Sequence, residues 1–219
     1  MDQKQELTEK ITEYSRKVGI DVIGYADPIL YNRFPEENRP NTFLKGTKSV
    51  IIVGIHLYDI ILDVWSKNEE LRKSLQFADS VLKNYCNSLS KFIHKQGYES
   101  KIIQYNPGLY LKDSAALAGI GPVGKNNLLI TKKYGSQVRL RAIVTTAPLV
   151  YGKPIFESKL CKECNICIEA CPAAAFPNGN YDKMLCLGYN HANWKDLSDF
   201  SRLWCNKCIE SCPIGKINF

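Results

Sequence analysis

Residues 161–172 read CKECNICIEACP, and residues 205–213 read CNKCIESCP. The first stretch has the spacing C-x2-C-x2-C-x3-C-P, which is typical of bacterial proteins that hold two iron–sulfur clusters. The second stretch repeats the latter half of this pattern, and an isolated cysteine lies between the two. The eight cysteines of this region, Cys161, Cys164, Cys167, Cys171, Cys186, Cys205, Cys208 and Cys212, therefore suit two [4Fe-4S] clusters with none left over.

The spacing within the first stretch has a mechanical reason. Three cysteines two residues apart wrap a loop around one face of a cluster, whereas the x3 step carries the fourth sulfur one helical turn away, toward the other cluster. The proline that follows keeps the chain from folding back. We expect one cluster on Cys161, Cys164, Cys167 and Cys212, and a second on Cys171, Cys186, Cys205 and Cys208. A pair of zinc sites is the alternative because C-x2-C also suits tetrahedral zinc, but zinc sites rarely use this run.

The 219-residue chain is 45% hydrophobic, enough for one ordinary core and a small appended module. We expect a domain over residues 1–150 and a cysteine module over 151–219, with Pro148 and Pro154 marking the boundary. The longest apolar run is interrupted by charged residues, and the charged N-terminus lacks an apolar segment. We therefore expect a cytoplasmic protein with no membrane partner, where clustered cysteines favour metal over disulfides.

The formal net charge is +7. Two oxidised four-iron clusters held by thiolates carry about −2 each, so part of this excess balances the metal sites. The remaining positive charge is compatible with a nucleic-acid partner such as tRNA.

Hydrophobic periodicity predicts alternating helices and strands before the cysteines. We expect helices over 7–18 and 111–119, strands over 20–27, 48–57 and 98–105, a loop or lid over 28–46, and a hairpin over 126–146 that turns at Tyr134-Gly135-Ser136. One long helix follows the stripe Leu71, Leu75, Ala78, Leu82, Tyr85, Leu89 and Phe92 and ends at Gly97. Beside that stripe, Cys86 is expected to be an inert buried thiol. Residues 195–204 are expected to form a helix that, with Trp194 and Trp204, shields the clusters.

Residues 118–130, AGIGPVGKNNLLI, match two nucleotide-binding patterns at once. A dinucleotide fingerprint must follow a strand and open a helix, but here the predicted helix comes first and a predicted strand follows. A P-loop needs Ser or Thr after the lysine, and Asn126 takes that place. We therefore reject a nucleotide. Gly119 is expected to cap the preceding helix in a left-handed conformation. The density of glycines favours a close approach of backbone to something large and flat.

The stretch AGIGPVGKNNLLITKKYGSQVRLRAIVTTAPL, followed by the cysteine run, resembles the epoxyqueuosine reductases and short proteins related to them. The resemblance reaches back to GTKSVIIVGIHL at residues 46–57 and covers most of the chain. It implies an α+β fold: a nitroreductase-like cobalamin-binding domain followed by a bacterial two-cluster ferredoxin-like domain, which passes electrons to cobalt. The sequence is similar, more distantly, to respiratory reductive dehalogenases.

The resemblance also implies site residues. The corrin would be lined by Gly119, Gly121, Gly124, Lys125, Asn126 and Asn127, with Arg139 and Arg141 alongside. Epoxyqueuosine reductases carry an acidic residue upstream as a proton donor, but this chain has Tyr105 and Asn106 there. Because the dehalogenases use a tyrosine as their acid, Tyr105 is the candidate proton donor. The alternative is a packed strand aromatic.

The leading hypothesis is a cobalamin-dependent iron–sulfur reductase that takes electrons from a low-potential donor and acts on an unidentified substrate. A second hypothesis is an electron-transfer or reductive-activating protein whose partner is a corrinoid protein. A third keeps the clusters and places flavin on the nitroreductase-like fold.

Overall fold

The computed structural model describes residues 2–67 and 76–215, which divide into two compact units. Unit 1 comprises Met1–His56, Val81–Pro122 and Arg139–Phe156, and unit 2 comprises Leu57–Ser80, Val123–Val138 and Glu157–Phe219. Stretches before residue 150 thus contribute to both units. The division into domains 1–150 and 151–219 stays a prediction.

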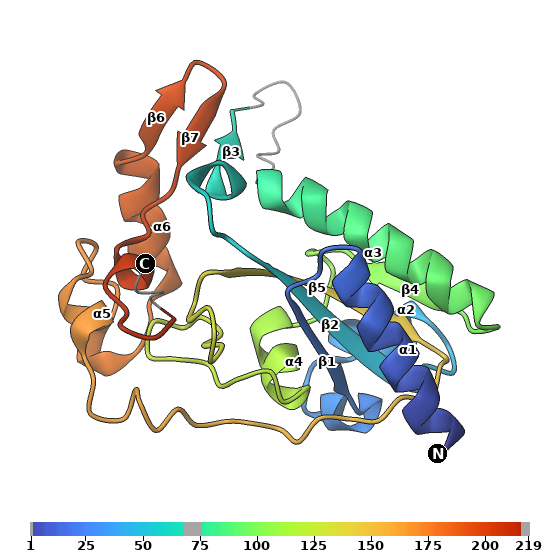
Figure 1. Cartoon of the computed structure of the whole chain (residues 1–219). Helices are drawn as coiled ribbons and strands as arrows, with labels where there is room; N and C mark the ends of the chain where they lie inside the picture. The colour runs from blue at the N-terminus through green and yellow to red at the C-terminus, as the bar shows by residue number, and fades with distance from the viewer. Residues whose placement is uncertain (1, 68–75, 216–219) are drawn as a thin grey trace. The chain divides into compact units, whose positions relative to one another are not determined.

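Unit 1 is built on a four-stranded sheet in the order β1-β2-β5-β4 (Figure 1). β1 (Val22–Ala26) pairs antiparallel with β2 (Ser49–His56), and β4 (Ser100–Ile103) pairs antiparallel with β5 (Val138–Thr145). All eight residues of β2 are buried, as expected for a strand whose two faces are both covered. The three predicted strands are thus confirmed, each slightly shorter than predicted.

Two long helices of unit 1, α1 (Gln3–Lys17) and α3 (Phe77–Lys95), lie side by side (Figure 1). Tyr14 of α1 stacks on Phe92 of α3 with ring centroids 4.2 Å apart. The stripe predicted for α3 is confirmed where it can be compared, because Ala78, Leu82 and Leu89 are fully buried. Leu71 and Leu75 lie outside the described residues. Gly97 ends this helix with φ +86°.

The third helix of unit 1, α4 (Leu111–Leu117), ends as the sequence predicts, at Gly119 with φ +74°. The N–H groups of Gly119 and Ile120 donate to the carbonyls of Ala116 and Ala115 at 3.1 and 3.0 Å, the paired bonds of a Schellman cap. A Cβ atom on Gly119 would lie 2.7 Å from the Lys153 carbonyl oxygen, and one on Gly152 would lie 2.1 Å from that of Ala118. Both positions therefore need glycine.

The expected loop between β1 and β2 contains three short helical turns. These are η1 (Pro28–Arg33), η2 (Glu36–Asn38) and α2 (Pro40–Phe43). Asp27 caps the first by accepting from the Ile29 N–H at 3.0 Å, and a proline begins the first and third. Proline at the first helical position explains why this proline-containing segment forms turns.

Unit 2 carries a three-stranded antiparallel sheet in the order β3-β7-β6 and several short helices. Its elements are η3 (Ile60–Asp63), β3 (Trp65–Ser66), α5 (Ile166–Glu169), η4 (Pro177–Gly179), α6 (Lys183–Ala192), β6 (Lys195–Ser198), β7 (Ser201–Leu203) and α7 (Lys207–Glu210). In the part of the chain that the structure describes, no helix combines the length and the apolarity needed to cross a membrane.

The helix predicted over residues 195–204 is wrong, because this stretch forms the hairpin β6–β7. The Ser198 and Ser201 hydroxyls lie 2.8 Å apart across its turn, and the Phe200 N–H donates to Ser198 Oγ at 3.2 Å. β7 also pairs with β3, from much earlier in the chain. This long-range pairing outweighs the local pattern.

The hairpin predicted over residues 126–146 is also wrong in its first arm. The second arm is β5, but β2 and β4 occupy both of its edges. Before it, only the isolated bridges Val123–Leu129 and Thr131–Gly135 form among the described residues. The predicted turn does exist. Thr131 and Gly135 exchange two backbone hydrogen bonds, and Gly135 has φ +55°.

Replacement of Gly119 by alanine should destabilise the protein more than the same change at Gly46. Both residues have a left-handed φ, but a Cβ on Gly46 would meet nothing within 4 Å. Gly46→Ala should therefore cost only the left-handed strain, about 1–2 kcal/mol. Gly119→Ala adds a clash with Lys153 and should lose roughly 2–5 kcal/mol. Urea unfolding of both variants measures this, and equal losses would contradict the proposed backbone contact.

Candidate functional site

Four of the expected cluster cysteines share one cavity in unit 2. Cys161, Cys164, Cys167 and Cys212 line a space of about 310 Å³. Burial raises the pKa of the Cys167 thiol, and the neighbouring thiols of Cys212, Cys161 and Cys164 raise it further. The structure thus brings together the four residues that the sequence assigned to the first cluster.

The other four cysteines meet around Cys208. Burial raises the pKa of its thiol to about 12, with further contributions from Cys205, Cys167, Cys171 and Cys186. Three of these belong to the second expected set. The fourth, Cys167, belongs to the first set, so the two groups of thiols are neighbours.

The sequence repeat becomes a structural repeat in α5 and α7. Asn165 and Asn206 precede these helices, each of four residues. After each helix, the backbone N–H of the next cysteine donates a hydrogen bond to an isoleucine carbonyl within the helix. The N–H of Cys171 donates to Ile168 at 3.2 Å, and that of Cys212 donates to Ile209 at 3.1 Å. The x3 step of the motif therefore places Cys171 and Cys212 in equivalent local geometry.

Two residues that sequence reasoning missed support the second group. Asn190 of α6 is 2% exposed; its amide donates to the Cys186 carbonyl at 2.9 Å and accepts from the Cys205 N–H at 2.7 Å. Tyr181 is hydrogen-bonded to the Cys186 side chain, and burial raises the pKa of its phenol. The four-residue spacing of Cys186 and Asn190 on a helix was the available signal for Asn190.

The thiols do not converge on a single ion. Among residues 2–67 and 76–215, no group of three or more His, Cys, Asp or Glu side chains is arranged to hold one metal ion. A tetrahedral zinc site would need its sulfurs about 2.3 Å from a common centre. Four thiolates around a four-iron cube stand further apart, because each binds a different iron.

The second half of the glycine motif belongs to unit 2 and turns toward the cysteines. Lys125 Nζ donates to the Lys162 carbonyl at 3.0 Å and to Asn165 Oδ1 at 2.9 Å. Asn126 is buried, and its Nδ2 donates to Ser136 Oγ at 2.9 Å. Both residues line the cavity of the first cysteine group. Their expected contact with a corrin stays a prediction.

The close approaches of the glycines are made to the chain itself. A Cβ on Gly124 would lie 2.7 Å from the Ile130 side chain, just as one on Gly119 would meet Lys153. Gly121 is buried, and Asn127 has φ +60°. The chain's own packing therefore accounts for glycine at positions 119 and 124 without a large flat ligand.

The elements on either side of the glycine motif agree only in part with those expected from the sequence. The strand expected after the glycines is absent, but α4 does precede them. No helix begins between residues 120 and 137, all of which the structure describes. A pyrophosphate would therefore find no helix N-terminus there.

Tyr105 lies in unit 1, in a tight loop after β4, and not in the strand. It is 39% exposed, and its hydroxyl donates to the Leu140 carbonyl at 3.1 Å. A Cβ on Gly108 would lie 2.0 Å from the Gln104 carbonyl oxygen, so the loop folds tightly back on itself. Asn38 Nδ2 donates to the Gly108 carbonyl at 2.6 Å and holds this loop. Asn106, beside Tyr105, is exposed.

Two guanidinium groups of β5 lie against the Tyr105 ring. Their central carbons are 5.0 Å (Arg139) and 4.5 Å (Arg141) from the ring centroid. Arg141 is 8% exposed and its Nε makes no hydrogen bond within the described residues. Side chains alternate along a strand, so both arginines share one face of β5. Arg141 is close enough to Cys86 of α3 to lower its pKa against the larger effect of burial.

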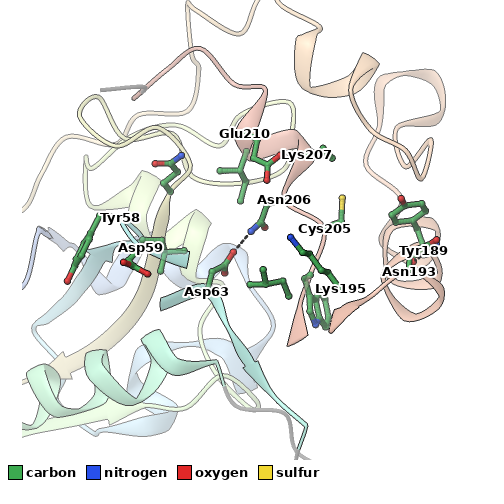
Figure 2. A pocket seen from close by; sticks show the side chains of 15 residues that line it. Tyr58, Asp59, Asp63, Tyr189, Asn193, Lys195, Cys205, Asn206, Lys207 and Glu210 are labelled. Carbon is green, nitrogen blue, oxygen red and sulfur yellow. Dashed lines mark hydrogen bonds and ion pairs between the residues drawn. The ribbon is translucent and has the colours of Figure 1, made fainter. Parts of the chain in front are cut away.

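A second cavity of unit 2, of about 390 Å³, lies beside Cys205 (Figure 2). Asp63 accepts hydrogen bonds from Asn206 and from Gln76 at its wall, and Lys207 pairs with Glu210 at 2.8 Å. Trp204, another lining residue, stacks on Trp65 with ring centroids 5.1 Å apart. The tryptophan next to Cys205 thus has an aromatic partner. Its expected shielding role stays a prediction.

Comparison with known proteins shows similarity to one group of enzymes over most of the chain. No family model matches. The epoxyqueuosine reductase of Listeria monocytogenes is 27% identical over 96% of this chain, which spans 65% of that relative's length. A solved epoxyqueuosine reductase with an epoxyqueuosine-modified tRNA-Tyr stem loop gives a TM-score of 0.72 at 22% identity, covering 96% of this chain and 66% of that one.

A more distant structure shares the same mixed helix-and-sheet fold. It is a reductive dehalogenase, described as suggesting a mechanism for B12-dependent dehalogenation, with a TM-score of 0.71 at 16% identity. The match covers 99% of this chain and 33% of the dehalogenase chain. The expected resemblance to epoxyqueuosine reductases is confirmed, and at these identities the structural likeness describes the fold alone.

Cys86 should resist alkylation as long as the protein is folded. It is fully buried, and burial raises the pKa of its thiol to about 12. At pH 8 roughly one thiol in ten thousand would then be ionised. Mass spectrometry after iodoacetamide treatment of the iron-free protein should find Cys86 unmodified, but modified once urea is added. Labelling of Cys86 as fast as half-buried Cys161 in the folded chain would contradict this.

Proposed function

We propose that this chain is a cobalamin-dependent iron–sulfur reductase of the epoxyqueuosine reductase type. The observation that carries the proposal is the gathering of eight cysteines into two groups of four, in a chain similar to these enzymes over 96% of its length. In this proposal unit 1 corresponds to the nitroreductase-like part and the cysteine region of unit 2 to the ferredoxin-like part.

The residues present fit two [4Fe-4S] clusters. Each cluster needs four thiolates, and the two groups supply four each, with Cys167 of one group near Cys208 of the other. When bound, the clusters would carry single electrons from a low-potential donor. Asn190 supports this role, since its hydrogen bonds fix Cys186 and Cys205 relative to each other.

Similarity supports the cobalamin part of the proposal. The glycines do not argue for a corrin by themselves, because the chain's own atoms occupy the space beside Gly119 and Gly124. Support comes from the epoxyqueuosine reductases and from the fold shared with a B12-dependent dehalogenase. A bound cobalamin would supply a Co(I) centre that acts as nucleophile or reductant.

Tyr105 is the proposed proton donor. Its hydroxyl donates to the Leu140 carbonyl at 3.1 Å and the residue is 39% exposed, so the proton leaves this hydrogen bond when it is delivered to a substrate. If the proton leaves, the two guanidinium groups within 5.0 Å of the ring centroid stabilise the phenolate that remains. The tight loop around Gly108 keeps this phenol in place. Asn106 is the neighbouring side chain that can donate a hydrogen bond to a substrate oxygen.

An epoxyqueuosine-modified tRNA stem loop is the substrate to test first. A stem loop of this kind occupies a solved epoxyqueuosine reductase of the same fold. The formal net charge of +7 leaves roughly +3 once two four-iron clusters are bound, a sign that still suits a polyanionic ligand. The alternative functions differ in what they need: an activating protein would reduce a corrinoid partner, and a flavoprotein would bind flavin in place of cobalamin.

Anaerobic reconstitution with iron and sulfide should yield about eight irons per chain, because two [4Fe-4S] clusters contain that number. Cobalamin added to this protein should change its optical spectrum and remain bound through gel filtration, whereas flavin should not. About four irons would contradict the two-cluster assignment. Flavin retained in place of cobalamin would favour the third hypothesis.

Tyr105→Phe should lower reduction of the modified stem loop by about 10²–10⁴-fold, the usual contribution of a positioned acid. Iron content and cobalamin binding should stay at wild-type levels, because only the hydroxyl is lost. Tyr110→Phe is the matched control, since Tyr110 is similarly exposed at 45% and lies five residues further along the chain. Full activity of Tyr105→Phe would remove Tyr105 as the proton donor.

A further inference from the structure

The Lys125 ammonium group is fastened to the loop that carries the first three cysteines. One acceptor is the carbonyl of Lys162, between Cys161 and Cys164, and the other is the amide oxygen of Asn165, just before Ile166. An ammonium group has three N–H donors, so two are used by this loop. Both bonds, at 3.0 and 2.9 Å, have ordinary length, and together they fix the position of the charge.

This charge lies at the wall of the first cysteine cavity without a neutralising partner there. None of the described residues that line the cavity is acidic; apart from the four cysteines they are apolar, except for Lys125 and Asn126. Lys125 is half-buried and its two hydrogen bonds are exposed to solvent, so water screens its charge only in part.

The second cysteine group has a different electrostatic environment. Lys207 is close enough to Cys205 for the two to interact, but it is exposed and pairs with Glu210 at 2.8 Å. The polar side chains hydrogen-bonded to Cys186 of that group, the phenol of Tyr181 and the amide of Asn190, are both uncharged. The pair of cysteine groups is therefore asymmetric in charge.

We infer that Lys125 raises the reduction potential of the cluster held by Cys161, Cys164, Cys167 and Cys212. This inference rests on the proposed function, since it requires the clusters. One-electron reduction makes a cluster more negative by one charge. A fixed cation nearby stabilises the reduced form more than the oxidised form and so raises the potential. Lys125 is a positioning residue in this role.

The test is a redox titration of the reconstituted full chain in which electron paramagnetic resonance measures the reduction of each cluster. In Lys125→Met, one of two reduction steps should move to a lower potential, by at least about 59 mV, which is a tenfold change for a one-electron couple. The other step should not move. Lys125→Arg keeps the charge and should stay closer to wild type. Lys91→Met removes one charge from an exposed position on α3 and should leave both steps unchanged.

Unchanged potentials in Lys125→Met with full iron content would overturn the inference. Equal shifts of both steps in Lys91→Met would overturn it too, because loss of any positive charge would then have the same effect. If Lys125→Met loses its iron, Asn165→Leu is measured instead, because it keeps the ammonium group and removes one of its two anchors. A shift confined to one step supports the inference, and an unchanged titration overturns it. Wild-type protein that takes up no four-iron clusters would refute the proposed function itself, which separates the two failures.

Discussion

Two stretches of backbone meet in unit 1 with no side chain between them, where Gly152 lies against the end of α4. Additional backbone hydrogen bonds hold this contact. The Gly152 N–H donates to the carbonyl oxygen of Tyr25 at 2.8 Å, and the Ile155 N–H donates to the carbonyl oxygen of Ala116 at 2.9 Å. The glycine motif leaves unit 1 after Pro122, and the chain toward the cysteines leaves it after Phe156. Both segments leave unit 1 a few residues after this backbone contact, at which a Cβ on either Gly119 or Gly152 would collide with a carbonyl oxygen of the other segment.

The features that the sequence predicted correctly depend on local chemistry. β2 is a continuous apolar run, Gly119 ends a helix, and the cysteine spacing groups its thiols through helices of one turn. The two wrong elements depend on distant partners. β5 is paired on both edges by strands from other parts of the chain, and β7 is paired by β3, so neither choice could be read from the nearby residues.

The candidate site shows the same limit for side chains. Motif spacing selected the eight cysteines as candidate ligands, because cluster chemistry favours that spacing. It could not foresee that Lys125 turns to the cysteine loop or that Asn190 joins Cys186 to Cys205, since both contacts bridge separate segments. Tyr105 could be selected from its position in the chain, but its exposure and its two arginine neighbours required the folded loop.

The interleaved composition of unit 2 has a consequence for biosynthesis. The ribosome makes residues 57–80 and 123–138 well before residues 157–219, which supply most of the unit. When residue 145 has been made, all four strands of the unit 1 sheet exist, but the two early segments of unit 2 still lack the residues they pack against. Domains that are contiguous in sequence can fold as they emerge, but unit 2 can close only once residues 157–219 have been made. Incorporation of the proposed clusters would then have to follow the synthesis of residues 157–219.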